Sequence, residues 1–166
     1  NNKNMKKTLF FLFTTIVVNT SFSQIDSTYY LKCVKILKKY PKSRINASDL
    51  YNASLKTYEK HNIVVPAELA IAQAIVETSL GNSGVGKSRN NPYSINSRKG
   101  YKRYKRISDG VLEYYDMMAR NYLRCKSTEQ LLQNFKNCKG GKYATSNKYL
   151  PYLRKIYYEI KKISDS

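Results

Sequence analysis

One glutamate in this sequence stands where acid chemistry is favoured. Glu77 interrupts a mainly apolar run, residues 66–80, close to the point where Gly81 ends it. Proline at the start and glycine just past the end predict a helix over 66–80. An apolar surround and the negative end of a helix dipole both disfavour a carboxylate, so we expect the pKa of Glu77 to be raised. A carboxyl held protonated near neutral pH can serve as general acid in glycosidic bond cleavage. The alternative is that Glu77 marks an exposed helix end.

The other acid of this run, Glu68, has a structural explanation. It lies in the first turn of the predicted helix, where a carboxylate interacts favourably with the helix dipole. At about 100° per residue, Glu77 lies on roughly the opposite side of the helix. The apolar composition predicts that this helix is buried at the centre of the domain. Glu77 is therefore the acid for which a chemical role is expected.

Three segments resemble blocks of one known family. Ala72–Ser83, which contains Glu77, resembles the AQA-x-x-E-S-x-x-G-x-S signature of the bacterial glucosaminidases, glycoside hydrolase family 73 of the lysozyme-like superfamily. Asn90–Ile95 resembles the NN-[LP]-[FY]-[GS]-I block of that family, and Lys142–Tyr149 resembles its YAT-x-x-x-Y block before the final helix. The resemblance spans residues 64–163 and implies a lysozyme-like fold.

The resemblance also implies roles for individual residues. Glu77 aligns with the catalytic general acid, and Tyr143 aligns with a cleft tyrosine that contacts the sugar or the reacting centre. Asn90, Asn91 and Tyr93 fall in the block that lines the cleft floor, and substrate contacts are expected from them. Asparagine offers a donor and an acceptor to an acetamido group, and tyrosine offers a stacking face. The alternatives are a core tyrosine at 143 and turn chemistry for the two asparagines.

The sequence departs from the family in its acids. Many members carry a second acid in the β-lobe, whereas residues 78–108 contain no Asp or Glu. A mechanism with two carboxylates therefore lacks an obvious second member. The N-acetyl group of the substrate could act as internal nucleophile with Tyr143 orienting it, or an acid such as Asp109 or Glu113 could fold in. A lytic transglycosylase route, in which Glu77 serves as acid and then base, is the third option. We favour the first.

The charge of the chain and its N-terminus point to export. The sequence has 30 Lys and Arg against 11 Asp and Glu, a net charge of +19 that favours a polyanionic partner. Met5 is followed by two lysines, an apolar run over 9–18 and a small-residue triplet at 21–23, the order of a secretory signal peptide. We expect cleavage of residues 1–23 and export to the periplasm or the cell exterior. The expected partners are peptidoglycan glycan strands and the anionic cell-wall surface, and no nucleic acid.

A cationic segment lies between the second block and the next predicted helix. Residues 97–106 contain six Lys and Arg together with Tyr101 and Tyr104. In an exported glucosaminidase this segment is suited to gripping stem-peptide carboxylates or an anionic wall polymer. We expect Tyr101 and Tyr104 to contact substrate, and Tyr104 also resembles an aromatic position of the family after the β-lobe. A nucleic-acid-binding patch and a solvated hairpin are the alternatives.

The function that these features imply is hydrolysis of peptidoglycan. We expect an endo-β-N-acetylglucosaminidase that cleaves β-1,4 bonds of the glycan strand, with no cofactor and as a monomer. A lytic transglycosylase or muramidase of the same superfamily is an alternative, and so is a relative that binds peptidoglycan without cutting it. A cationic protein that binds membranes or nucleic acid is a further possibility. With His61 as its single histidine, the chain is not expected to hold a zinc ion.

The elements that must position these residues are mainly helical. We divide the chain into a signal peptide (1–23), an N-terminal helical extension (24–62) and a glucosaminidase domain (63–166). The patterns predict a mainly α, lysozyme-like domain with a small loop or β-hairpin lobe. The expected elements besides 66–80 are helices at 29–40, 48–61 with Ser48 as N-cap, from Ser108 onward, from a Ser127–Gln130 capping box to Phe135, and 147–163, with a loop at 81–107 that pairs 93–95 with 101–107. Cys33, Cys125 and Cys138 allow three disulfide pairings, which the sequence leaves open.

Overall fold

The computed structural model describes residues 27–166. The expected signal peptide, residues 1–23, lies outside this part of the chain and stays a prediction. Along the chain the elements are a helical segment at 27–37, α2 (Ala47–His61), α3 (Ala67–Thr78), α4 (Gly84–Arg89), β1 (Asn96–Ser97), β2 (Gly100–Tyr101), α5 (Ile107–Met118), the π-helical turn η1 (Ala119–Leu123), α6 (Thr128–Asn134) and α7 (Tyr149–Asp165). Within the described part, none of these helices is long and apolar enough to cross a membrane.

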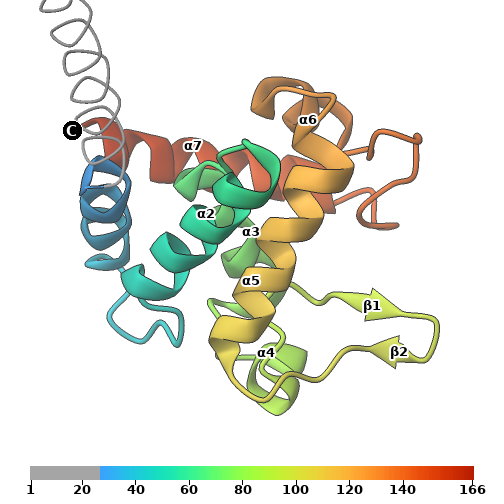
Figure 1. Ribbon diagram of the computed structural model, residues 1–166, viewed down its shortest axis with the longest axis horizontal. Helices are drawn as coiled ribbons and strands as arrows, with labels where there is room; N and C mark the ends of the chain where they lie inside the picture. The colour runs from blue at the N-terminus through green and yellow to red at the C-terminus, as the bar shows by residue number, and fades with distance from the viewer. Residues whose placement is uncertain (1–26) are drawn as a thin grey trace, which may run out of the picture.

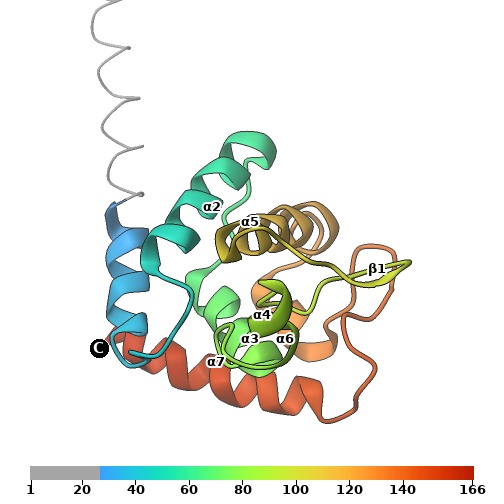
Figure 2. The same cartoon turned by 90° about the horizontal axis from the view of Figure 1, so that it is seen from below.

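The helices pack around α3, which runs through the middle of the molecule (Figures 1 and 2). The C-terminal helix α7 packs along α3, and α2 packs along α5. The two strands form an antiparallel hairpin in which Asn96 pairs with Tyr101 and Ser97 pairs with Gly100. This hairpin projects from the helical body (Figure 1). The arrangement confirms a mainly α domain with a small hairpin lobe, consistent with a lysozyme-like fold.

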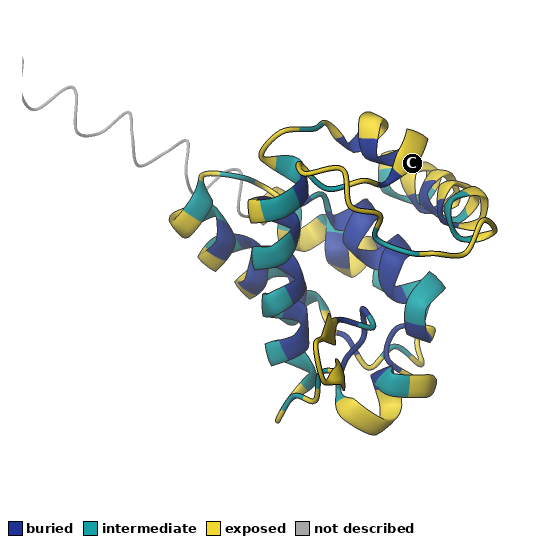
Figure 3. Cartoon of the chain, turned by 90° about the vertical axis from the view of Figure 1, so that its right-hand side faces the viewer, coloured by how far each residue is buried: buried dark blue, intermediate teal, exposed yellow. Residues whose placement is uncertain are grey.

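The central helix is buried as its apolar sequence predicts. Leu69, Ala70 and Ala72 are fully buried (Figure 3). Glu68, in the first turn, accepts from Lys32 Nζ at 2.9 Å and from the Ser164 hydroxyl at 2.8 Å. Burial alone would raise the pKa of Glu68, but these partners hold it below its ordinary value. The structural explanation expected for Glu68 is therefore confirmed.

Two helices differ from the prediction. The N-cap of α2 is Asn46 and not Ser48, because the Asn46 amide oxygen accepts from the Asp49 backbone in a reciprocal capping box. The short helix α4 lies inside the stretch expected to be a loop. Its two glycines suggested a turn, but Gly86 is there for packing: a Cβ at this position would lie 2.6 Å from the Thr78 Cβ.

The hairpin is shorter and lies closer to its turn than predicted. The paired strands do not extend over residues 93–95: beyond the Asn96–Tyr101 pair the Ile95 carbonyl still accepts from Lys102 N at 2.9 Å, whereas Tyr93 is buried in the core. The paired residues Asn96–Ser97 and Gly100–Tyr101 are all exposed (Figure 3). The apolar residues that suggested a strand therefore anchor the base of the hairpin instead.

The segment before α2 is packed onto the rest of the domain. The Tyr29 hydroxyl donates to the Val65 carbonyl at 2.9 Å and lies 2.7 Å from the Tyr115 hydroxyl. Cys33 is fully buried, and burial raises the pKa of its thiol to about 12. The other two cysteines, Cys125 and Cys138, form a disulfide, which is the short-loop pairing among the three that were open.

Candidate active site

Glu77 lies in the last turn of α3 and is half-buried. The chain leaves this helix through three successive left-handed residues, Ser79, Leu80 and Gly81, with φ of 50°, 58° and 84°. The Thr78 hydroxyl donates to the Pro92 carbonyl at 2.7 Å. The end of the helix and the loop that follows are thereby held together beside the Glu77 side chain.

The environment of Glu77 favours its protonated form. Burial raises the pKa of its carboxyl, while hydrogen bonds from the hydroxyls of Ser94 and Tyr149 lower it by a smaller amount. The net shift is upward, as the sequence predicts. Ser94 adopts a left-handed backbone, with φ of 52°, at the point where its hydroxyl reaches Glu77. The acid is therefore both desolvated and provided with hydrogen-bond donors for its ionised form.

A chain of side-chain hydrogen bonds leads from the core to Glu77. Gln73 lies one turn before Glu77 on α3 and is fully buried. Its amide nitrogen donates to the Tyr149 hydroxyl at 2.9 Å, and its amide oxygen accepts from the Tyr114 hydroxyl. Because the Gln73 amide occupies an acceptor position of Tyr149, the phenolic proton of Tyr149 is free to point at the Glu77 carboxylate. The buried side of this network therefore holds the Glu77 carboxyl in position through the Tyr149 hydroxyl.

Tyr143 is half-buried and lies beside Tyr149. The two rings stack with centroids 5.8 Å apart, and Phe135 packs edge-on against Tyr143 at 5.2 Å. The Tyr143 hydroxyl donates to the Tyr93 carbonyl at 2.9 Å. Burial raises the pKa of Tyr143 well above its ordinary value, with a further contribution from the nearby Glu77. The structure thus brings together Glu77, Tyr143 and Tyr149.

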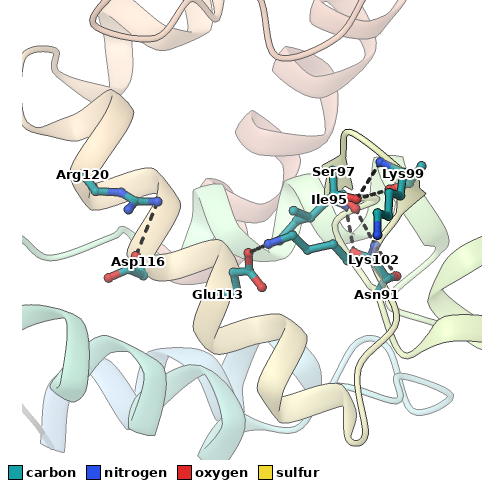
Figure 4. A network of polar contacts seen from close by, with 9 residues as sticks. Asn91, Ile95, Ser97, Lys99, Lys102, Glu113, Asp116 and Arg120 are labelled. Carbon is teal, nitrogen blue, oxygen red and sulfur yellow. Dashed lines mark hydrogen bonds and ion pairs between the residues drawn. The ribbon is translucent and has the colours of Figure 1, made fainter.

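The two asparagines direct their side chains at the backbone. The Asn91 amide nitrogen donates to the carbonyls of Ile95, at 2.9 Å, and Lys102, at 3.1 Å, while its amide oxygen accepts from Ile95 N at 2.8 Å (Figure 4). The Asn90 amide donates to the carbonyls of Tyr104 and Lys105. Both legs of the hairpin are thereby joined to the loop that follows Glu77.

The three tyrosines expected to contact substrate differ in exposure. Tyr93 is fully buried and stacks on Tyr114, with ring centroids 3.6 Å apart. Tyr104 is half-buried, and burial together with the neighbouring Glu113 raises the pKa of its phenol. Tyr101 lies on β2 with 47 % of its surface exposed. Of these tyrosines, Tyr101 has the ring most open to a ligand.

The acids that could have served as a second carboxylate have cationic partners. Glu113 on α5 is paired with Lys102 of the hairpin (Figure 4). Asp109 accepts from the Arg106 guanidinium at 2.9 Å and caps the first turn of α5. The Glu113 carboxylate thus binds the hairpin, and the Asp109 carboxylate stabilises the start of α5. This arrangement favours a mechanism in which Glu77 is the single acid.

Sequence reasoning did not select Gln73, Tyr149 or Ser94 for this site. Gln73 precedes Glu77 by four residues, a spacing that places both on the same helix face. Tyr149 ends the third matched block, and Ser94 lies within the second. The signals were therefore present for all three. The sequence could not show that Gln73 and Tyr149 are in contact, because the two residues are 76 positions apart.

Arg44 holds the loop after Glu77 in place. One guanidinium nitrogen donates to the carbonyls of Gly81 and Gly86, each at 3.0 Å, and the other donates to the Asn90 side chain at 2.9 Å. The Arg44 backbone N–H also donates to the Leu80 carbonyl at 3.1 Å. A single side chain thus joins the end of α3, α4 and the base of the hairpin.

Arg44→Ala is expected to lower both stability and activity. Hydrogen bonds to charged groups contribute about 1.5–3 kcal/mol, and each kcal/mol moves Tm by roughly 2–4 °C in a chain of this size. A fall in Tm of about 3–12 °C follows from the two ranges, measured by thermal unfolding. Any activity that depends on Glu77, assayed well below Tm, should also fall because the loop beside Glu77 loosens. Arg154→Ala, on the exposed side of α7, is the control; equal Tm values for the two variants would contradict the expectation.

The helical fold presents a half-buried acid with a raised pKa beside two tyrosines, and a carboxyl of this kind is suited to the role of general acid in glycosidic bond cleavage. In the described residues, no group of three or more His, Cys, Asp or Glu side chains is placed to hold a metal ion. A family model named Glucosaminidase, described as mannosyl-glycoprotein endo-β-N-acetylglucosaminidase, matches residues 52–162, and the chain belongs to this family. The resemblance to the glucosaminidases is thereby confirmed. The comparison with curated proteins gives no match.

Proposed function

We propose that this protein is an exported endo-β-N-acetylglucosaminidase that hydrolyses β-1,4 bonds of peptidoglycan glycan strands, with Glu77 as the general acid. The family, whose members include peptidoglycan hydrolases, supports the reaction class. The observation that carries the assignment of Glu77 is its position: the carboxyl is half-buried, has a raised pKa and meets the hydroxyls of Ser94 and Tyr149. A monomer suffices for this site, because all of these groups come from one chain.

The first step uses the proton of Glu77. Glu77 transfers this proton to the glycosidic oxygen as the bond between that oxygen and the anomeric carbon breaks. The carbonyl oxygen of the substrate's own acetamido group then bonds to the anomeric carbon and forms a cyclic oxazolinium ion. Tyr143 orients the acetamido group for this attack. The positive charge that develops on the sugar is offset by the ionised Glu77 carboxylate.

The second step returns the proton. A water molecule attacks the anomeric carbon, the carbon–oxygen bond to the acetamido group breaks, and Glu77 accepts a proton from the water. The hydroxyls of Ser94 and Tyr149 stabilise Glu77 while it is ionised between the two steps. We assign Asn90, Asn91 and Tyr93 the task of holding the loop around the site, and Tyr101 a stacking contact with a sugar.

Export is supported by the disulfide. Cys125 and Cys138 are exposed, and exposed disulfides persist in oxidising compartments and are rare in the cytosol. This agrees with the N-terminal pattern of residues 1–23, which favours a cleaved signal peptide. We propose that the mature protein acts in the periplasm or outside the cell, where the anionic wall surface attracts its positive charge.

Mass spectrometry of the fragments released from purified sacculi tests the reaction. Hydrolysis by a glucosaminidase leaves N-acetylglucosamine at the reducing end. N-acetylmuramic acid at that end would instead identify a muramidase, and its anhydro form would identify a lytic transglycosylase, which also needs only one acid. A wild-type protein that pellets with sacculi but releases no fragments would favour a binding module without activity.

Tyr149→Phe is expected to move the basic limb of the pH–activity profile to higher pH. Catalysis needs protonated Glu77, so kcat/KM falls as the pH rises through the pKa of that carboxyl. The Tyr149 hydroxyl stabilises the ionised form, so its removal raises the pKa of Glu77 further. Loss of one hydrogen bond should also lower kcat by about 2–10-fold. The profile of kcat/KM against pH measures the shift, with Tyr152→Phe, on the exposed side of α7, as the control. A limb that moves to lower pH would contradict the assignment.

A further inference from the structure

The hairpin carries more positive charge than its surroundings neutralise. Two of the six Lys and Arg side chains in residues 97–106 form ion pairs. Lys102 pairs with Glu113, and Arg106 pairs with Asp109. The other four side chains are exposed and form no ion pair within residues 27–166; we call them the hairpin cations: Arg98, Lys99, Arg103 and Lys105. The field of these four charges is therefore directed at solvent.

The hairpin is held firmly in relation to Glu77. Asn91 joins its two legs, and the Arg89 guanidinium donates to the Tyr101 carbonyl at 3.1 Å. The same loop is tied to the end of α3 by the bond from Thr78 to the Pro92 carbonyl. Hydrogen bonds thus run without a break from the helix of Glu77 to the base of the hairpin. The cations lie at a fixed place relative to the candidate acid.

The hairpin borders the side of the molecule that contains the site. In both views, the hairpin and the loop after α6, which carries Tyr143, project from the same side of the helical body (Figures 1 and 2). The Tyr143 hydroxyl donates to the Tyr93 carbonyl, which connects that loop to the hairpin base. The hairpin and the loop that carries Tyr143 therefore border the same side of the molecule.

The chemistry of the cations and their place identify the partner. This step rests on the proposed function. The glycan of peptidoglycan is largely uncharged, and its negative charge lies in the carboxylates of the stem peptides that every second sugar carries. A guanidinium binds a carboxylate through two parallel hydrogen bonds, and lysine offers a point charge beside it. We propose that the hairpin cations bind stem-peptide carboxylates, so that the protein prefers peptide-bearing glycan over bare glycan.

Charge-removal variants on two surfaces test this preference. The hairpin variant replaces Arg98, Lys99, Arg103 and Lys105 with Gln. The control variant replaces four exposed cations of α7, Arg154, Lys155, Lys161 and Lys162, with Gln and so loses the same charge. The substrates are intact sacculi and soluble glycan strands from which an amidase has removed the stem peptides and whose freed lactyl carboxyls are then capped as methyl amides, so that these strands are uncharged. Thermal unfolding establishes that each variant is folded.

The hairpin variant should show an increase in KM of about tenfold on intact sacculi, since each exposed ion pair contributes little and four act together. Its kcat, and its KM on peptide-free glycan, should match the wild type, and the control variant should match the wild type on both. Added salt should raise the KM of the wild type on intact sacculi toward that of the hairpin variant. The proposal would be overturned if KM rose equally in the hairpin and α7 variants, or if KM of the hairpin variant rose equally on both substrates.

Binding measured without cleavage separates this proposal from the proposed reaction. The two sets of substitutions are repeated in the Glu77→Gln background. Pelleting with intact sacculi measures binding to peptide-bearing glycan, and release of the pelleted protein by added peptide-free glycan strands measures binding to bare glycan. Loss of binding to intact sacculi in the hairpin set alone supports the proposal even if the wild type cuts nothing. A DNA duplex that displaces the protein more effectively than soluble stem peptides would identify a nucleic-acid surface and overturn it.

Discussion

Glu77→Gln is expected to lower kcat on peptidoglycan by about 10³-fold, within the range that a positioned general acid contributes. The amide has the shape of the acid but carries no transferable proton, so the glycosidic oxygen leaves without protonation. Binding to sacculi should be retained, because the Ser94 and Tyr149 hydroxyls that meet Glu77 can also hydrogen-bond an amide. Release of soluble fragments measures kcat, and pelleting with sacculi measures binding.

The stability of the same variant provides an independent check. The folded pKa of Glu77 is above its ordinary value, so the stability that this group provides is complete at low pH and is lost as pH rises through the folded pKa. A neutral Gln escapes this loss, and Tm near neutral pH should be equal to or above that of the wild type. Glu68→Gln is the matched control on the same helix. It breaks the contacts with Lys32 and Ser164 and should lower Tm while kcat stays unchanged.

A Glu77→Gln protein that keeps kcat within a few-fold of the wild type would place the acid elsewhere. Glu113 would then be the next residue to test, because it lies at the hairpin base. Glu113→Gln breaks its pair with Lys102 and should loosen the hairpin without removing the catalytic proton. If Glu77→Gln does remove activity and Glu113→Gln lowers kcat by as much, the two results together would favour a two-carboxylate mechanism.

Tyr143→Phe is expected to lower kcat by about 10²-fold, the low end of the effect of removing one donor aimed at developing charge. In the proposed mechanism its hydroxyl orients the acetamido group during attack on the anomeric carbon. The substitution also removes the bond from this hydroxyl to the Tyr93 carbonyl, but the stacking with Tyr149 and the edge contact with Phe135 remain, so the loop should stay folded. Steady-state rates on soluble glycan fragments measure the change. Tyr122→Phe, in the same aromatic cluster, serves as the control.

A change to the substrate tests the same step as the Tyr143 variant, namely attack by the acetamido group. Replacing the N-acetyl group with an N-trifluoroacetyl group weakens the carbonyl oxygen as a nucleophile. If the acetamido group attacks, the wild type slows strongly on this substrate, and Tyr143→Phe adds little further loss. Full wild-type activity on the altered substrate would exclude the internal nucleophile.

Local patterns made much of the fold predictable. The helix α3 could be predicted from residues 66–80 because its signals are local: an apolar run begins at Pro66 and ends at Gly81. The capping box from Ser127 to Gln130 was likewise confirmed at the start of α6. The helix α4 was missed because Gly84 and Gly86 weaken the local helical signal. Gly84 has a positive φ of 50°, and Gly86 leaves room for the Thr78 side chain, and neither reason is visible in the local sequence.

The candidate site was predictable only in part, for the same reason. Glu77 could be selected because its surroundings in sequence already disfavour a charge. Its partners Gln73 and Tyr149 meet across the interface of α3 and α7, which no local pattern describes. Asn91 was expected to contact substrate, and its side chain instead satisfies backbone groups of the hairpin. An exposed loop and a buried one use the same residue types, so composition alone does not distinguish the two.

The hydrogen bonds of Arg44 to the loop after Glu77 bear on where a fragment that contains the site must begin. The family match starts at Asn52, in the middle of α2, and so leaves out Arg44 together with the Asn46 cap. A fragment trimmed to the matched boundaries would lose the first turn of α2 and the tie across the loop beside Glu77. Sequence comparison restricted to the shared region would also overlook a residue that shapes the site. We therefore expect that a fragment with an intact site must begin upstream of the family match, before the helical segment at 27–37.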